Sequence, residues 1–201
     1  MLKRHPALAG FVGTHALPVA GSAPRDPLFS GTIYFAQVTF NTSGGTLVVA
    51  NADMTTIVAY AQHAIVPISE YAAAQYGPNT VSVSSTILRS IVSVPSGAFT
   101  DADLQGWISA IASDNTLPTN SCIYVICPSG ISAHEIGANA GYHSFANIPY
   151  VVAGVYATEL TLADASDVYA MVISHEMAEM IVDPNVDGQN PEVCDPCDLN
   201  C

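Results

Sequence analysis

The sequence VISHEMAEMIVDP, at residues 172–184, is the most informative part of the chain. Apolar residues recur through it at helical spacing, and an Asp-Pro pair closes it, which predicts the C-terminal part of a helix. His175 and Glu179 are four residues apart and therefore share one helix face, with Glu176 next to the histidine. This arrangement follows the His-Glu-x-x-His pattern of zinc hydrolases, with glutamate in place of the second histidine.

A catalytic zinc site needs three protein ligands and one open position. We expect His175 and Glu179 to provide two of these ligands, and Glu176 to act as the general base toward water. The candidates for the third ligand are Asp183, Glu192, Asp195 and His143. Two carboxylates and one imidazole form an oxygen-rich set, which suits Mn²⁺ or Ca²⁺ as well as Zn²⁺.

Outward from this helix, predicted strands and helices alternate along the chain. Strands are predicted where β-branched and aromatic residues gather or alternate with serine, at residues 31–40, 80–94, 123–126 and 150–156. Helices are predicted at 53–76, kinked or divided at Pro67, at 101–112 and at 165–182. Loops are predicted at 130–147 and 183–201. This order indicates a single domain of the α/β or α+β class, with helices packed on a mixed sheet.

The composition limits the partners of the protein. Acidic residues outnumber basic ones by 17 to 4, the net charge is −13, and Lys3 is the only lysine. Nucleic acid is excluded as an expected partner, because its binding needs lysine and arginine to displace counterions. No apolar run reaches the roughly 18 residues of a transmembrane helix, so no membrane span is expected.

Residues 1–29 are expected to form an N-terminal arm ahead of one domain at 30–201. Lys3 and Arg4 precede small apolar residues and Gly21-Ser22-Ala23, an order similar to that of secretory signal peptides. Polar residues and a proline interrupt the apolar part, and a disordered arm fits the same residues. A secreted or cell-surface location and a disordered arm therefore both stay open.

The five cysteines fall into two groups. Cys122 and Cys127 lie in an apolar run, where a free cysteine typically acts as a small core residue. Cys194, Cys197 and Cys201 crowd the C-terminus, and Cys194-x-x-Cys197 supplies only two zinc ligands by itself. Disulfide bonds in an exported protein are the favoured interpretation, with the pairing open and an odd thiol left over.

Five segments occur here in the order in which similar segments occur in one known family. They are Leu104–Pro128, Gly141–Phe145, Tyr150–Val155, Val172–Pro184 and Glu192–Asp195. On these segments, residues 30–201 resemble the Exordium-like (phosphate-induced) family of plant cell-wall proteins and its bacterial and fungal relatives. Two features depart from that family. Alanine stands where a cysteine usually precedes the Gly-Tyr-His segment. The family's further aromatic-rich tail is not among these 201 residues, as expected of a shortened chain.

The resemblance implies a zincin-like metallopeptidase architecture in a secreted or surface-associated protein. It makes His175, Glu176 and Glu179 the metal and catalytic positions, and it adds weight to Glu192 and Asp195. The leading hypothesis is a zinc-dependent hydrolase, in particular a peptidase acting on a peptide or protein. The alternatives are a non-catalytic, metal-stabilised surface protein and a descendant of such a fold that binds no metal.

Overall fold

The computed structural model describes residues 27–133, 141–154 and 162–186. Most of the predicted N-terminal arm, the C-terminal loop from residue 187 and the end of the strand predicted at 150–156 lie outside these ranges. Glu192 and Asp195 and the three C-terminal cysteines lie outside them as well. The described residues form a mixed α+β domain with one large sheet and three helices.

The large sheet is six-stranded and is organised around its first strand. β1 (Gly31–Thr42) pairs in parallel with β3 (Val81–Ser93) and with β5 (Ser121–Ile126). Its far end turns back in a hairpin to the short β2 (Gly45–Leu47), which is antiparallel to it. Parallel neighbours need crossover connections, and α1 supplies the one between β1 and β3.

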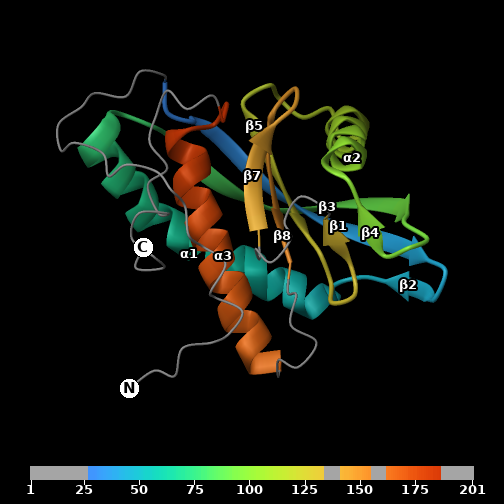
Figure 1. Cartoon of the computed structure of the whole chain (residues 1–201). Coiled ribbons are helices and arrows are strands. Elements are labelled where there is room, and N and C mark those ends of the chain that lie inside the picture. Colours follow the sequence, from blue (N-terminus) through green and yellow to red (C-terminus); the bar gives the residue numbers. More distant parts are fainter. Residues whose placement is uncertain (1–26, 134–140, 155–161, 187–201) are drawn as a thin grey trace.

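The other end of the described sheet changes direction. β8 (Pro149–Ala153) is parallel to β5, whereas β7 (Gly141–Phe145) is antiparallel to β8. A separate two-stranded ladder joins β4 (Ala98–Phe99) to β6 (Ser132–Ala133). β7 is thus the last strand of the described sheet on the side where the candidate site lies (Figure 1).

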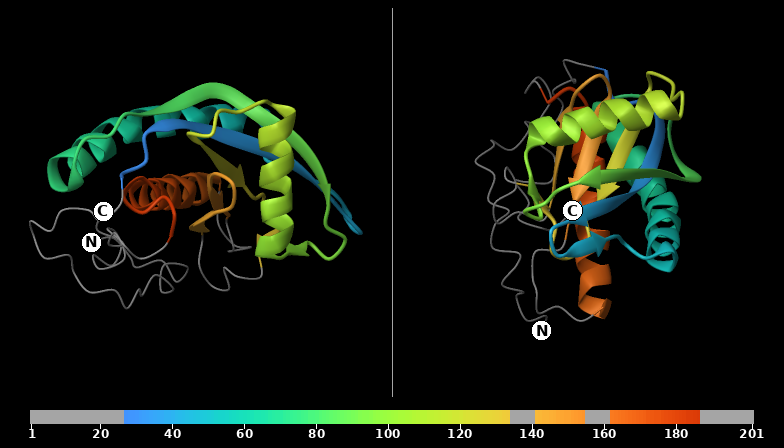
Figure 2. Two further views of the ribbon diagram at one scale, coloured as in Figure 1. Left: turned by 90° about the horizontal axis from the view of Figure 1, so that it is seen from above. Right: turned by 90° about the vertical axis from the view of Figure 1, so that its right-hand side faces the viewer.

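The helices form layers on the two faces of this sheet. α1 (Asn51–Tyr76) and α3 (Leu162–Val182) pack against each other and share one apolar core with the sheet. α2 (Asp101–Asp114) belongs to a second core on the opposite face, and Figure 2 shows it well apart from the α1 and α3 pair. A capping box starts α2, since the Thr100 side chain and Asp103 cap each other's backbone. None of the described helices combines the length and apolar character that crossing a membrane requires.

Strand β5 supplies side chains to both cores, because alternate residues of a strand face opposite ways. All six of its residues are buried. Cys122 and Tyr124 lie in the core with α1 and α3, whereas Ile123 and Val125 lie in the core with α2. The prediction that Cys122 and Cys127 are buried, free core residues is confirmed.

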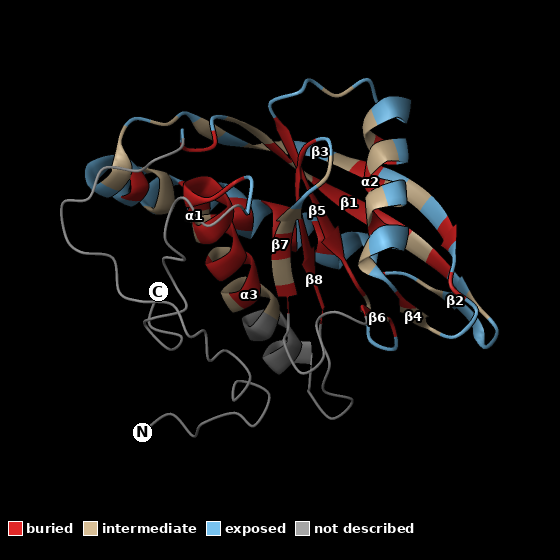
Figure 3. Ribbon diagram, turned by 45° about the horizontal axis from the view of Figure 1, so that its top comes forward, coloured by how far each residue is buried: buried red, intermediate tan, exposed pale blue. Residues whose placement is uncertain are grey.

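The C-terminal half of α3 is buried on almost every side. From Val172 to Asp183 only Ser174 and Ala178 are partly exposed, and Figure 3 shows burial along most of its described length. One of these two, Ser174, contacts the hydroxyl of Tyr60 on α1 at 2.6 Å. A helix enclosed in this way has its position fixed by packing, so polar groups on its inner side sit in a rigid setting.

Most predicted elements are confirmed, with two corrections. The loop predicted at residues 130–147 is wrong at 141–145, which form β7, and at 132–133, which form β6. Both strands are short: β6 pairs with the distant β4, which the local sequence does not reveal, and β7 forms a hairpin with the next strand, β8. Of the two effects predicted for Pro67, a kink or a division, the division is wrong, because α1 runs as one helix through this exposed proline.

Gly141 is required for β7 and α3 to approach. A Cβ atom at this position would lie 2.6 Å from a Val172 methyl carbon and 2.8 Å from the Val152 carbonyl oxygen. We expect Gly141→Ala to push α3 away from the sheet and to lower the free energy of unfolding by about 1–3 kcal/mol.

Chemical denaturation measures this effect, and Gly106→Ala provides the matched control. Gly106 lies in α2 with open space around its Cβ position, so alanine there should raise stability by roughly 0.5–1 kcal/mol. Equal stability of Gly141→Ala and wild type would contradict the close approach.

Candidate metal centre

The candidate site lies where the inner face of α3 meets β7. His175, Glu176 and Glu179 come from α3, and His143 comes from the middle of β7. The period of an α-helix places the glutamates three residues apart on one side, and the alternation of β7 turns His143 toward them while Tyr142 belongs to the opposite core. Two elements that are distant in sequence therefore bring four ligand-type side chains together.

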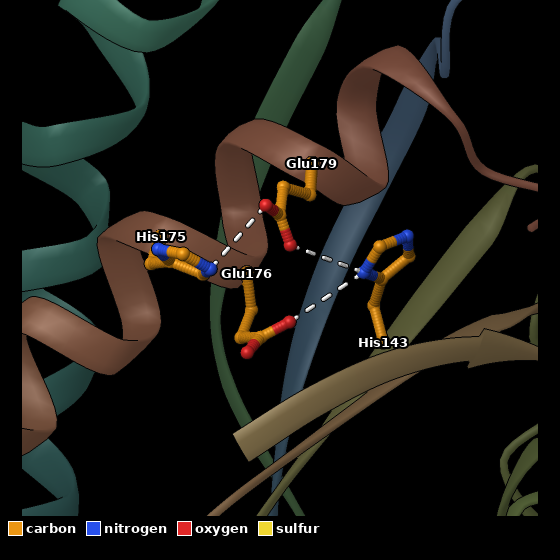
Figure 4. A network of polar contacts seen from close by, with 4 residues as sticks. All are labelled: His143, His175, Glu176 and Glu179. Atoms are coloured by element: carbon orange, nitrogen blue, oxygen red, sulfur yellow. Dashed lines mark ion pairs between the residues drawn. The ribbon is translucent and has the colours of Figure 1, made fainter. Parts of the chain in front are cut away.

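The polar ends of these four side chains point toward one another (Figure 4). The Nδ1 atom of His143 lies 3.5 Å from Oε2 of Glu176 and 3.6 Å from Oε2 of Glu179. The other oxygen of Glu179, Oε1, lies 3.3 Å from Nε2 of His175. Glu179 thus lies between two imidazoles, and one atom each from His143, Glu176 and Glu179 falls within 4.8 Å of the others.

All four side chains are buried, with relative exposures of 8% for His143, 5% for His175, 2% for Glu176 and 4% for Glu179. Burial raises the pKa of Glu176, because it penalises the charged carboxylate. The hydrogen bond with His143 lowers this pKa, and the charge of Glu179 raises it. Two carboxylates enclosed so closely need positive charge nearby, from protonated imidazoles or from a metal ion.

The structure brings some of the predicted site residues together and leaves others apart. His143 was one of four candidates for the third ligand, and it is the one that reaches the glutamates. Asp183 is buried at the end of α3, where its backbone N–H donates to the Glu179 carbonyl, and His175 contacts Glu179, but neither is in the group that could hold an ion as the side chains stand. Glu192 and Asp195 lie outside the described residues.

Two details go beyond the sequence-based prediction. Glu176 lies beside His143 among the potential ligand atoms, as well as at the position expected for a general base. Gly141, which the sequence marked only as part of a Gly-Tyr-His segment, lies against the site, since a Cβ there would be 3.3 Å from Oε1 of Glu176. A glycine two residues before a histidine on a short strand was the available signal for this close packing.

Comparison with protein-family models, with curated proteins and with solved structures finds no match to this chain. The geometry of the site is therefore the observation from which a function can be argued.

The raised pKa of Glu176 predicts a pH dependence of the metal-free protein. A folded-state pKa above the unfolded value of about 4.3 contributes stability below that value, and the contribution is lost as pH rises through the folded-state pKa. Glu176→Gln removes this titration. We expect the variant to become progressively more stable than wild type as pH rises from about 4 to about 8.

Thermal unfolding with a chelator present, at a series of pH values, measures the difference. Parallel pH profiles for the two proteins would show that folding leaves the pKa of Glu176 unchanged.

Proposed function

We propose that this protein binds a divalent metal ion, preferably zinc, between α3 and β7 and uses it to hydrolyse peptide bonds. The observation that supports the proposal is the buried group of two imidazoles and two carboxylates around the His-Glu-x-x-Glu helix. Buried charges of this kind are typically paired or bound to a metal.

The spacing of the group fits a zinc ion. Ligands held about 2.0–2.1 Å from a tetrahedral zinc lie roughly 3.3–3.4 Å from one another. The three nitrogen–oxygen contacts in the group measure 3.5, 3.6 and 3.3 Å. His143, Glu176 and Glu179 therefore need to move little to accept an ion, whereas His175 contacts the other oxygen of Glu179 and has to turn toward the ion.

The donor types favour zinc over the other ions considered. Calcium takes six to eight oxygen ligands, and magnesium is bound mainly through carboxylates and water. Nitrogen atoms of His143 and His175 point into this group, and imidazole suits zinc and other late transition metals. Manganese tolerates such a mixed set less well than zinc does, which makes it the second choice.

The chain's own residues have separable roles in this proposal. His143, His175 and Glu179 hold the ion, and Glu176 takes a proton from the attacking water and returns it to the leaving amine. A carboxylate whose pKa is raised by burial is a better base near neutral pH than an exposed one. The ion, when bound, supplies Lewis-acid chemistry that polarises the scissile carbonyl.

The zincin-like architecture, the protein family and the location are part of the same proposal. A zincin-like architecture is supported by the helix with its His-Glu pair lying against an antiparallel strand at the end of a mixed sheet. Membership of the Exordium-like family and a secreted or surface location rest on the sequence resemblance described above.

A second function is favoured by the depth of the site. None of its four side chains is more than 8% exposed, and a closed metal site typically stabilises a fold rather than catalysing a reaction. In that case the same ion would hold α3 to β7 in a metal-stabilised, non-catalytic protein.

Glu176→Gln and Glu179→Gln separate the two roles of the glutamates. If Glu176 is the base, Glu176→Gln retains zinc affinity and lowers peptide hydrolysis by about a hundredfold or more. Glu179→Gln should lower zinc affinity itself, because it removes a carboxylate from between two imidazoles.

Zinc competition with a chromogenic chelator measures affinity, and a fluorogenic peptide library measures turnover. Equal loss of zinc by both variants would make Glu176 a ligand and contradict its role as base. A wild-type protein that binds zinc, gains thermal stability from it and cleaves no library member would establish the second function instead.

A further inference from the structure

The floor of the site is formed by a row of side chains that crosses the sheet. In register, Phe35 of β1 lies opposite Tyr124 of β5, Tyr124 opposite Val151 of β8, and Val151 opposite His143 of β7. Residues that are directly opposite in neighbouring strands project to the same face. Phe35, Tyr124 and Val151 all belong to the core that includes α3, so Tyr124 faces the same helix as His143.

Tyr124 carries a polar group into this apolar floor. Its side chain is fully buried, and its ring packs against Phe35 with a centroid distance of 5.0 Å. Within the described part of the chain its hydroxyl oxygen makes no hydrogen bond. A phenylalanine would fill the same space without burying a hydroxyl, so packing alone gives no reason for tyrosine here.

The two glutamates of the site are the carboxylates whose charge affects this hydroxyl. Burial raises the pKa of Tyr124 well above its ordinary value, and Cys122, Glu176 and Glu179 raise it further. The phenol is therefore protonated, and it can donate a hydrogen bond to a carboxylate that comes within reach. Glu176 contacts His143 through Oε2, which leaves its Oε1 as an acceptor.

We propose that Tyr124 is a positioning residue of the metal site, whose hydroxyl donates a hydrogen bond to the Glu176 and Glu179 pair when an ion is bound. Outer hydrogen bonds of this kind orient metal ligands and restrict their rotation. The inference rests on the metal site of the proposed function and adds a residue that neither the His-Glu-x-x-Glu pattern nor its neighbouring segments contain.

Tyr124→Phe tests the proposal in the full chain, with Tyr150→Phe as the matched control. Tyr150 is also buried, but it lies on β8 in the opposite core, and its hydroxyl donates a 2.7 Å hydrogen bond to Asp101. We expect Tyr124→Phe to weaken zinc binding by roughly 10- to 100-fold, the usual effect of losing an outer partner of a metal ligand. Tyr150→Phe should leave zinc affinity unchanged.

Two further readouts separate positioning from packing. The absorption spectrum of the Co²⁺-loaded protein should change in Tyr124→Phe and not in Tyr150→Phe, because it reports the geometry of the ligands. Without metal, Tyr124→Phe should unfold at the same temperature as wild type or higher, since no hydrogen bond is lost. A Tyr124→Phe protein that fails to fold without metal would overturn the inference, because its hydroxyl would then have a structural role.

Unchanged zinc affinity and an unchanged Co²⁺ spectrum in Tyr124→Phe, beside a wild type that binds both ions, would overturn this inference alone. A wild-type protein that binds neither ion would overturn the proposed function and this inference together.

Discussion

The burial of two carboxylates against two imidazoles, between α3 and β7, is the constraint on which the rest of the structure depends. Apolar residues around Glu176 and Glu179 hold α3 against the sheet, and Gly141 allows the close approach that places His143 beside them. Such a group is unfavourable when its charges are unbalanced and stable when a cation completes it. The packing of α3 against the sheet and the balance of charge at the site therefore depend on the same side chains.

The sheet contributes more than support. Its parallel strands give β5 two buried faces. At the end of the sheet, the antiparallel strand β7 places His143 beside the glutamates of α3. The core on the other face, around α2, has its own polar group, in which Tyr142 and Tyr150 both donate hydrogen bonds to Asp101. That group ties the N-terminus of α2 to β7 and β8 on the face of the sheet opposite the site.

Much of this arrangement could be predicted from the sequence, for reasons that are local. The helical spacing around His175, the β-branched residues of β1 and the capping residues before α2 are short-range patterns. β7 was not predicted, although it forms a hairpin with β8, because GYHSF lacks the β-branched residues that are typical of a strand. The choice of His143 among four possible ligands also depended on this pairing. The alignment of Tyr124 with His143 needs the register of three strands, which no local pattern encodes.

The central claim is that the group between α3 and β7 binds a metal ion. The most direct test is the metal content, by mass spectrometry, of the full chain purified without added metal or chelator. His143→Ala and His175→Ala are the informative variants, and His63→Ala, at an exposed position of α1, is the control. The account predicts close to one equivalent of zinc in the wild type and the control, and a large loss in both site variants. A wild type that carries no metal, even after titration with zinc, would contradict it.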